Sequence, residues 1–348
     1  MITRDIKFIH RIIRSNFGKL KFPYKLTFAA TYRCNLKCKT CLIWAKTPRS
    51  EMGLEEIDSF FKKSNEFSWI DLTGGEIFVR RDIRGIINII LDRCRSLSIL
   101  HFPTNGFLTD EIVEAARDIK KRGDVTLVIT VSVDGPKELH NEMRGGKKDV
   151  WDRAVKTFVS LKSLGIKRVY IGYTISQYNI GKIDETFKSI KDVYGKLSYS
   201  DMHFNIFHNS EHYLNNASHE FPPENLLKEE ILKIKSMKKR PSLMNLIEET
   251  YLKTIPRYLD TKKMPVRCQA LNSSVFLDPY GDIYPCSIYN RKLANIKEID
   301  YDITKLASME AAVTLRKEII EEKCNGCCTF CEVFPSILGS LFRGRFLI

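Results

Sequence analysis

Three cysteines within one short segment constrain this chain more than any other feature of its sequence. They are Cys34, Cys38 and Cys41, at the spacing C-x3-C-x2-C. Thiolates this close can occupy three corners of one metal centre, and an iron-sulfur cube with three cysteine ligands leaves one iron open for an outside ligand. A structural zinc site is the alternative, but it usually requires a fourth Cys or His at close spacing, and none follows here. The motif therefore favours a [4Fe-4S] cluster with an open position.

The composition is that of an ordinary globular enzyme. The chain has 348 residues, of which 43% are hydrophobic, so that it can bury a large core. No apolar run reaches the length of a membrane span, and the N-terminal segment lacks the apolar stretch of a secretory signal. We therefore expect a cytoplasmic protein, in which the ten cysteines stay reduced and serve as metal ligands rather than in disulfides.

The chain is basic, with 56 Lys and Arg residues against 42 Asp and Glu residues and a net charge of +14. This excess favours an anionic partner such as a phosphorylated metabolite, nucleic acid, an acidic peptide or lipid headgroups. In residues 4–17, apolar residues recur at helical spacing among basic residues, at Ile6, Ile9, Ile13 and Phe17. They predict either a helix that lies on a membrane surface or, as the favoured interpretation, a terminal helix that packs this stripe against the domain.

Short β-rich runs alternate with helical stretches up to about residue 207. Six such units imply a parallel sheet with right-handed crossovers, whose binding site lies at the carboxyl ends of the strands. An open doubly wound sheet and a partial barrel are both compatible with this spacing. The expected strands are 25–31, 68–73, 98–103, 125–133, 168–174 and 200–207, and the expected helices are 54–66, 82–95, 109–122, 150–164 and 181–194.

The segments that follow these strands hold the candidate ligand-binding residues. Two glycines and a carboxylate follow the second strand, and the glycines would let the backbone approach a ligand closely. A Thr-Asn-Gly turn follows the third strand, and Ser-Val-Asp-Gly with a later Arg-Gly pair follows the fourth. We expect His140, between these last two, to lie on a helix surface. The candidates are Gly74, Gly75, Glu76, Asn105, Ser132, Asp134 and Arg144.

Taken together and in this order, these motifs resemble the signature of the radical S-adenosylmethionine (SAM) superfamily. The resemblance implies a partial (β/α)6 barrel in which Cys34, Cys38 and Cys41 bind a catalytic [4Fe-4S] cluster. It also implies that the open iron chelates SAM, and that reductive cleavage gives a 5′-deoxyadenosyl radical that abstracts hydrogen from a substrate. The seven candidates above would then contact SAM. One position departs from the family pattern, because Thr40 stands where an aromatic residue is usual, and Trp44 is a candidate replacement.

A second group of cysteines lies near the C-terminus. The Asp-Pro-Tyr-Gly sequence at 278–281 separates two β-rich runs and predicts a hairpin that brings Cys286 near Cys268. By ligand chemistry alone, zinc and an iron-sulfur cube are equally acceptable here. The region resembles the SPASM and Twitch extensions of radical SAM enzymes, which implies one auxiliary [4Fe-4S] cluster. The implied ligands are Cys268, Cys286, Cys324 and Cys327, with Cys331 as the substitute.

These features predict an α/β fold, a partial (β/α)6 TIM-like barrel with a small C-terminal cysteine-rich auxiliary cluster domain. Its expected parts are an N-terminal helix at 1–24, the radical SAM partial barrel at 25–207, a helical linker at 208–265, a SPASM/Twitch-like domain at 266–335 and a C-terminal tail at 336–348.

For the substrate, the resemblance and the charge favour oxidation or cross-linking of a small polar or anionic metabolite. Peptide maturation of the RiPP type is the alternative, weakened because maturases often carry an additional peptide-docking domain, and only about 24 residues precede the first expected strand. A redox-neutral epimerase, with Cys328 as a conceivable hydrogen donor, and a non-enzymatic iron-sulfur or zinc protein are further alternatives. The expected reductant is a flavodoxin or ferredoxin, no nucleic acid is expected, and the N-terminal helix could make a weak membrane-surface contact.

Overall fold

The computed structural model describes residues 2–237, 243–321, 323–324 and 326–342. Within these ranges nine strands form one sheet, in the order β6-β5-β4-β3-β2-β1-β7-β8-β9. The first six pair in parallel with their neighbours in the chain, as the alternating pattern predicts. These strands are β1 (Lys25–Thr31), β2 (Trp69–Gly74), β3 (Ile99–Thr104), β4 (Thr126–Ser132), β5 (Arg168–Ile175) and β6 (Met202–Ile206).

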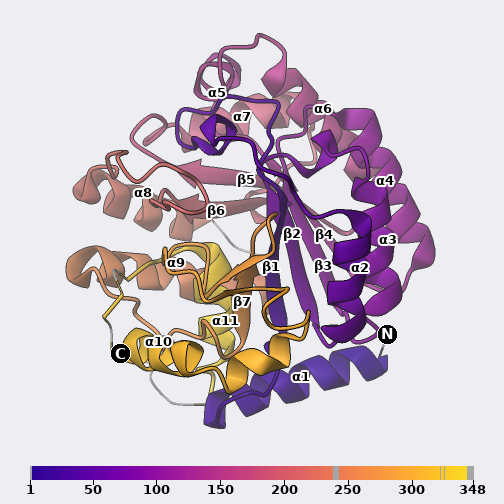
Figure 1. Ribbon diagram of the computed structural model, residues 1–348. Helices are drawn as coiled ribbons and strands as arrows, with labels where there is room; N and C mark the ends of the chain where they lie inside the picture. Colours follow the sequence, from indigo (N-terminus) through magenta and orange to yellow (C-terminus); the bar gives the residue numbers. More distant parts are fainter. Residues whose placement is uncertain (1, 238–242, 322, 325, 343–348) are drawn as a thin grey trace.

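Helices that connect the parallel strands cover the outer face of this sheet (Figure 1). Apolar side chains that point outward from the strands pack under them; the ring of Phe28 on β1, for example, meets Phe61 with their centroids 6.1 Å apart. The short helix α5 (Lys137–Met143) was not expected. The five expected helices all form, as α2 (Leu54–Lys63), α3 (Ile83–Arg93), α4 (Thr109–Arg122), α6 (Val150–Ser163) and α7 (Ile183–Val193).

The inner face of the sheet is polar, because every second side chain of a strand points to it. Asp71 of β2 forms an ion pair with Lys25 of β1 at 2.9 Å and contacts the ring of His101 of β3 at 3.0 Å. His101 in turn lies 3.0 Å from the hydroxyl of Thr130 on β4. The pair of Lys25 and Asp71 is almost fully buried, so this network ties four neighbouring strands together across the inner face.

The C-terminal hairpin continues the sheet of the barrel. Strand β7 (Ser274–Leu277) pairs in parallel with β1, and β8 (Asp282–Tyr284) runs antiparallel to β7, followed by the short β9 (Ala294–Asn295). The predicted hairpin is confirmed, and Gly281 at its turn has a φ of +84°, a conformation that glycine adopts at little cost. The cysteine-rich region that we expected as a small domain from residue 266 thus shares its sheet with the barrel.

Four further helices complete the molecule around the open side of the barrel. Helices α9 and α11 lie between β6 and β7 (Figure 1), where the ring of Tyr251 meets Phe330 and Phe334 at 6.0 and 5.9 Å. The helical linker expected at 208–265 contains the first two of these four helices. The four are α8 (Glu224–Met237), α9 (Leu243–Thr261), α10 (Glu310–Ile320) and α11 (Phe330–Leu338).

Helix α1 (Ile2–Phe17) crosses the molecule below the amino ends of the strands (Figure 1). It packs through Phe8, whose ring meets Tyr24 at 5.4 Å, and through the fully buried Asn16. The helix closes one end of the domain, as the favoured interpretation expected. The stripe at Ile6, Ile9, Ile13 and Phe17 is not the face that packs, because these four side chains are exposed. The apolar side chains of α1 that pack against the core are instead Phe8 and Ile12. No helix among the described residues is long and apolar enough to cross a membrane.

Candidate active site

The loop that carries Cys34, Cys38 and Cys41 begins at the carboxyl end of β1. It has little regular secondary structure, and backbone hydrogen bonds hold it in place instead. The amide of Lys39 donates to the carbonyl of Met143 at 2.8 Å, and the side-chain amide of Asn216 donates to the carbonyl of Thr40 at 2.9 Å. The loop is therefore positioned by segments from two other parts of the chain.

The three thiols lie close enough together to affect one another. Burial, with a smaller contribution from the negative charge of Cys38, raises the pKa of Cys34 to about 11 and that of Cys41 to about 12. Burial also raises the pKa of Cys38. Three half-buried thiols that resist ionisation fit a metal centre, because only a bound cation would compensate three thiolates there. The donor set is soft and gives three ligands, which suits a cube with one open iron.

Arg144 and Asp134 form a buried ion pair beside this loop. The Nε of Arg144 lies 2.9 Å from Asp134 Oδ2, and its Nη1 lies 3.8 Å from the Sγ of Cys38. Burial disfavours the charge of Arg144, but the attraction of Asp134 outweighs it, so that the pKa of the guanidinium is raised. The second oxygen of Asp134 accepts a hydrogen bond from the amide of Thr174 at 3.0 Å. Both predicted residues thus lie at the thiol loop, already paired with each other.

Glu76 is buried at the end of β2. Its carboxylate accepts hydrogen bonds from the Thr104 hydroxyl at 3.0 Å and from the Asn105 amide at 2.7 Å. Burial raises the pKa of Glu76 to about 7, although these hydrogen bonds oppose the shift. A carboxyl group that changes charge near neutral pH can accept a hydrogen bond from an ammonium group and attract its charge.

The close packing of two backbone segments requires glycine at positions 74 and 75. A Cβ on Gly74 would lie 2.1 Å from the carbonyl oxygen of Thr31, and one on Gly75 would lie 2.2 Å from that of Arg33. The amide of Gly75 donates to the Thr31 carbonyl at 2.8 Å. The two glycines therefore allow the start of the thiol loop to pack closely against them, and their contact with a ligand stays a prediction.

Two more residues show how the neighbouring loops join this site. Asn105 donates from its side-chain amide to the side-chain oxygen of Asn35 at 2.8 Å, which links the Thr-Asn-Gly turn to the thiol loop. His140 is fully buried, so its expected place on a helix surface is wrong. Its Nδ1 accepts from the Asp134 amide at 3.0 Å, and burial with the nearby Arg144 lowers its pKa to about 3. Ser132 lies half-buried at the end of β4.

Sequence reasoning missed several residues of this site. Asn179 lies on a loop after β5, and its side-chain amide donates to the carbonyl of Asp134 at 2.8 Å. The hydroxyl of Tyr213 lies 2.9 Å from the Thr73 hydroxyl and donates to the Gly74 carbonyl at 3.2 Å. No local motif marks Asn179 or Tyr213. Thr104 could have been found, because it belongs to the Thr-Asn-Gly motif.

The thiols of Cys268, Cys286 and Cys327 lie near enough to affect one another's charge, and Cys324 lies near Cys268. Their role as ligands stays a prediction. Burial raises the pKa of Cys268 to about 11, with a contribution from Cys324, and raises the pKa of Cys327 well above its ordinary value, with contributions from Cys286 and Cys268. The carbonyl of Cys268 accepts a hydrogen bond from Arg316 at 2.7 Å. Among the described residues no three Cys, His, Asp or Glu side chains are grouped tightly enough for a single metal ion. In a cube, each cysteine binds a different iron.

The two remaining C-terminal cysteines point elsewhere. Burial raises the pKa of Cys331 to about 12, and the charged groups near its thiol are Lys25, Asp71 and Glu332 rather than the other cysteines. The Cys328 thiol is buried 3.6 Å from the hydroxyl of Thr254 on α9. Cys331 is predicted as the substitute ligand, and this role stays a prediction.

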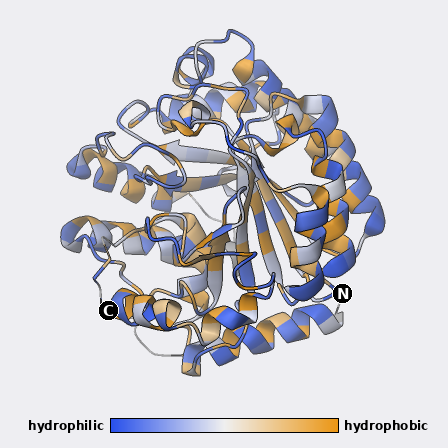
Figure 2. Ribbon diagram, in the orientation of Figure 1, coloured by the Kyte–Doolittle hydropathy of each residue, from blue (hydrophilic) through white to orange (hydrophobic). Residues whose placement is uncertain are grey.

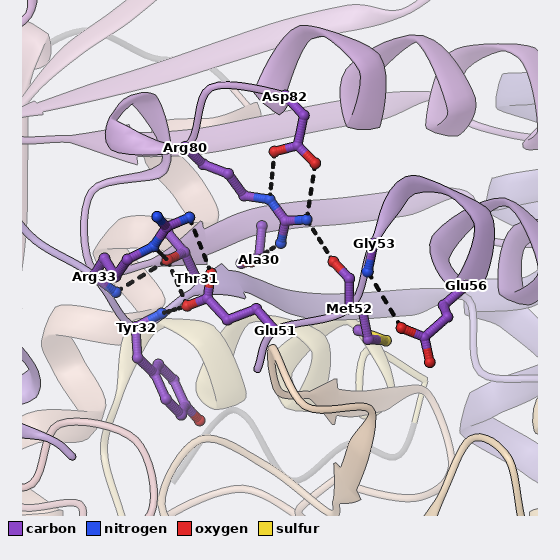
Figure 3. Close-up of polar contacts among 10 residues, drawn as sticks. All are labelled: Ala30, Thr31, Tyr32, Arg33, Glu51, Met52, Gly53, Glu56, Arg80 and Asp82. Atoms are coloured by element: carbon purple, nitrogen blue, oxygen red, sulfur yellow. Dashed lines mark hydrogen bonds and ion pairs between the residues drawn. The ribbon is translucent and has the colours of Figure 1, made fainter. Parts of the chain in front are cut away.

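A pocket of about 480 Å³ opens beside Cys34. Figure 3 shows two of its acidic residues paired, Glu51 with Arg33 at 3.3 Å and Asp82 with Arg80 at 2.7 Å. Two further cations of the lining lie over aromatic rings: Arg49 is 4.1 Å from the centroid of Tyr280, and Lys46 is 4.8 Å from that of Tyr32. The charged residues of the lining are Arg33, Lys46, Arg49, Glu51, Arg80 and Asp82, so the pocket has an excess of positive charge.

Curated proteins similar to this chain include a bacteriocin biosynthesis protein and a mycofactocin maturase. The antilisterial bacteriocin subtilosin biosynthesis protein AlbA of Bacillus subtilis is 24% identical over 302 residues, which are 84% of this chain and 62% of that protein. The mycofactocin maturase MftC of Mycobacterium ulcerans is 25% identical over 191 residues, 54% of this chain and 49% of that protein. The chain spans 43–62% of the length of these curated relatives.

Solved structures confirm the predicted fold. Streptococcus suis SuiB bound to S-adenosylmethionine has a TM-score of 0.62 at 16% identity, over 88% of this chain and 70% of that one. Native anSMEcpe with bound AdoMet has a TM-score of 0.61 at 15% identity, over 93% of this chain and 97% of that one. Residues 29–190 match the model of the radical SAM superfamily. The chain therefore contains a radical SAM domain, as its motifs predicted, and such a domain implies a [4Fe-4S] cluster and SAM as cofactors.

Proposed function

We propose that this chain is a radical SAM enzyme that abstracts hydrogen from a peptide substrate. The proposal rests mainly on the contact between Arg144 and the thiol of Cys38. This contact lies next to Asp134 and at the same end of the sheet as Glu76. When bound, the cluster and SAM supply a 5′-deoxyadenosyl radical. Cys34, Cys38 and Cys41 would hold three irons of that cluster, and the fourth iron would stay open because no fourth cysteine of the described chain joins this group.

The residues around the thiols suit the polar ends of SAM. Arg144 presents a permanently charged guanidinium, which binds a carboxylate through two hydrogen bonds. Its present partner Asp134 is held by the amide of Thr174, so the pair is positioned before any ligand arrives. Glu76 is the acceptor we assign to the methionine ammonium, and Ser132, Asp134 and Asn105 would line the nucleoside. Gly74 and Gly75 would hold Glu76 close to the thiol loop.

A radical must be shielded from water and oxygen. In this fold, helices α9 and α11 would provide part of that shield. The open side between β6 and β7 is filled by aromatic residues of α9 and α11, among them Tyr251 and Phe330. The hydroxyl of Tyr251 donates to the side chain of Asn205 on β6 at 3.0 Å, which fastens this cover to the barrel. The space that remains for substrate is at the carboxyl ends of the strands.

The comparisons favour a peptide over the small metabolite that the charge first suggested. AlbA and MftC are biosynthetic proteins of a bacteriocin and of mycofactocin. SuiB has been solved with its precursor peptide SuiA, at a TM-score of 0.57 to this chain. A peptide with acidic side chains also suits the net charge of +14. An anionic metabolite stays the second candidate, because the pocket beside Cys34 holds more positive than negative charge.

An auxiliary cluster belongs to this proposal. Cys268, Cys286, Cys324 and Cys327 would hold it, and it would accept the electron left after hydrogen abstraction or anchor the substrate. Cys328 gives no support to the epimerase alternative, because its thiol is enclosed against Thr254. All ten cysteines are free thiols in the structure, which suits a reducing cytoplasm and a flavodoxin or ferredoxin as reductant.

The substrate class can be tested by what stimulates SAM cleavage. The reconstituted protein would be reduced with dithionite, and 5′-deoxyadenosine would be measured with a peptide pool or a small-metabolite pool, separated by size from the source cells. We expect the peptide pool to raise 5′-deoxyadenosine formation by about tenfold or more. Stimulation by the small-metabolite pool alone would support the second candidate. The amount of 5′-deoxyadenosine formed without either pool measures SAM cleavage independently of the substrate.

A further inference from the structure

Helix α1 presents an uncovered apolar face to solvent. The side chains are exposed by 60% at Ile6, 55% at Ile9, 38% at Ile13 and 69% at Phe17. The C-terminal segment extends this face, because the ring of Phe342 stacks on Phe17 with a centroid distance of 6.1 Å. Figure 2 shows hydrophobic bands along α1 at the base of the molecule. The apolar stripe, as we call it, consists of Ile6, Ile9, Ile13, Phe17, Leu341 and Phe342.

The stripe is exposed although the helix is firmly attached. On the opposite face Phe8 packs on Tyr24, and the side-chain amide of Asn16 donates to the carbonyl of Leu338 at 2.9 Å. Arg11 contacts Glu66 in an ion pair on the same side. These contacts fix the rotation of α1 about its axis, so the stripe cannot turn inward. An apolar face held outward by its own helix usually marks an interaction site.

The charge along α1 identifies the kind of surface that would cover the stripe. Residues 1–21 contain six Lys and Arg residues and a single acidic residue, Asp5. Lys7, His10 and Arg14 are exposed and follow one long edge of the stripe at helical spacing. A helix with an apolar face and a cationic edge lies in the interface of an anionic bilayer, with its apolar side chains among the acyl chains.

A second copy of the chain fits this face less well. Two copies related by a twofold axis would bring the same cationic edges together, which like charges oppose. A stable interface also needs about 800 Å² from each partner, and six side chains on one helix and one short segment offer a narrow strip. The positive charge instead matches a surface of negative headgroups.

We propose that α1 binds the protein to the surface of an anionic membrane, with the apolar stripe inserted and with Lys7 and Arg14 at the headgroups. The helix lies at the amino ends of the strands, whereas the thiol loop begins at the carboxyl end of β1. Docking through α1 therefore leaves the catalytic end open, on the side away from the bilayer (Figure 1). This inference goes beyond the proposed radical chemistry and does not depend on it.

The test is sedimentation of the whole protein with vesicles. One set of vesicles contains phosphatidylglycerol and phosphatidylcholine, and the other contains phosphatidylcholine alone. We expect wild type to sediment with the anionic set, and less as salt rises. The double variant Ile9→Ser/Phe17→Ser should lose at least about tenfold in partitioning, because both side chains leave the acyl region. The matched control is Leu232→Ser/Val193→Ser, whose side chains are 57% and 59% exposed on α8 and α7.

The possible results separate the alternatives. The control variant should partition like wild type, and both variants should keep the far-UV circular dichroism of wild type and its SAM cleavage under dithionite. Equal sedimentation of wild type and Ile9→Ser/Phe17→Ser, or no sedimentation with either vesicle set, overturns the proposal. A dimer in light scattering that Ile9→Ser/Phe17→Ser converts to a monomer would also overturn it, in favour of a second copy on the stripe. A wild type that binds vesicles but does not cleave SAM would instead count against the proposed function alone.

Discussion

The guanidinium Nη1 of Arg144 lies 3.8 Å from the Sγ of Cys38, while its Nε bonds Asp134 at 2.9 Å. One side chain thus contacts both the proposed cluster ligand and a proposed SAM contact. Arg144 belongs to the segment after β4, and Cys38 belongs to the loop after β1. The contact therefore joins two candidate sites that are more than one hundred residues apart in the chain.

Removal of the Arg144 side chain should lower both the stability of the protein and its affinity for SAM. Arg144→Met would leave the carboxylate of Asp134 buried without its partner, and we expect a loss of about 3 kcal/mol in the free energy of unfolding. SAM binding should also weaken by about tenfold or more, since a charged hydrogen bond to its carboxylate is lost. Denaturant titration and calorimetry would measure the two effects. In the control Arg144→Met/Asp134→Asn the buried charge is gone, so stability should recover in part and SAM binding should not. Recovery of both would refute the assigned role of Arg144.

The affinity for SAM should depend on pH through Glu76. The pKa of its carboxyl group is raised by burial to about 7, so the group is neutral below that pH and charged above it. Only the charged form attracts an ammonium group. We therefore expect SAM affinity to rise between pH 6 and about 7 and to level off near pH 8, in calorimetric titrations of the reconstituted protein. Glu76→Gln should bind SAM more weakly and without this step. The same pH profile in wild type and in the Gln variant would assign the step to another group.

The glycines beside Glu76 offer a test of close packing. In Gly75→Ala the new Cβ would lie 2.2 Å from the carbonyl oxygen of Arg33, so the thiol loop has to move. We expect a loss of about 2 kcal/mol or more in unfolding free energy and a lower iron content after reconstitution. Gly195→Ala is the control, because no other atom would lie within 4 Å of its new methyl group, and its stability should change by less than about 0.5 kcal/mol. Equal effects of the two substitutions would argue against this account of the motif.

The grouping of the C-terminal thiols predicts which cysteines bind the auxiliary cluster. Cys268→Ala and Cys286→Ala should each lower the iron content from about eight to about four atoms per chain, because a cube that loses a ligand assembles poorly. Cys331→Ala is the matched control, since its thiol lies near Lys25 and Asp71, and it should keep about eight irons. Anaerobic iron and sulfide analysis would measure this. Loss of iron in Cys331→Ala with none in Cys268→Ala would show a different ligand set.

Much of the barrel could be predicted from the sequence because its signals are local. Strand β1 and helix α4 match their expected ranges at both ends, and the other expected strands differ by a few residues at most. The hairpin before Cys286 was also predictable from its turn residues. Each of these rests on hydrophobic periodicity or turn chemistry, which act over neighbouring residues.

What the sequence did not reveal depends on contacts between distant segments. The pairing of β7 with β1 and the position of Cys331 beside Lys25 both join residues far apart in the chain. The burial of His140 is a matter of packing, although its partner Asp134 is only six residues away. Helix α1 shows a different limit. Its sequence contains two apolar faces, and periodicity alone cannot say which one the barrel covers.

The central claim is that Cys34, Cys38 and Cys41 hold a cluster that cleaves SAM, and one experiment tests it most directly. Wild type and the Cys34→Ala/Cys38→Ala/Cys41→Ala variant would be reconstituted without oxygen, analysed for iron, reduced with dithionite and given SAM. The account predicts about eight irons in wild type and about four in the variant, with 5′-deoxyadenosine formed by wild type alone. Zinc in place of iron, or SAM left intact by wild type, would contradict it.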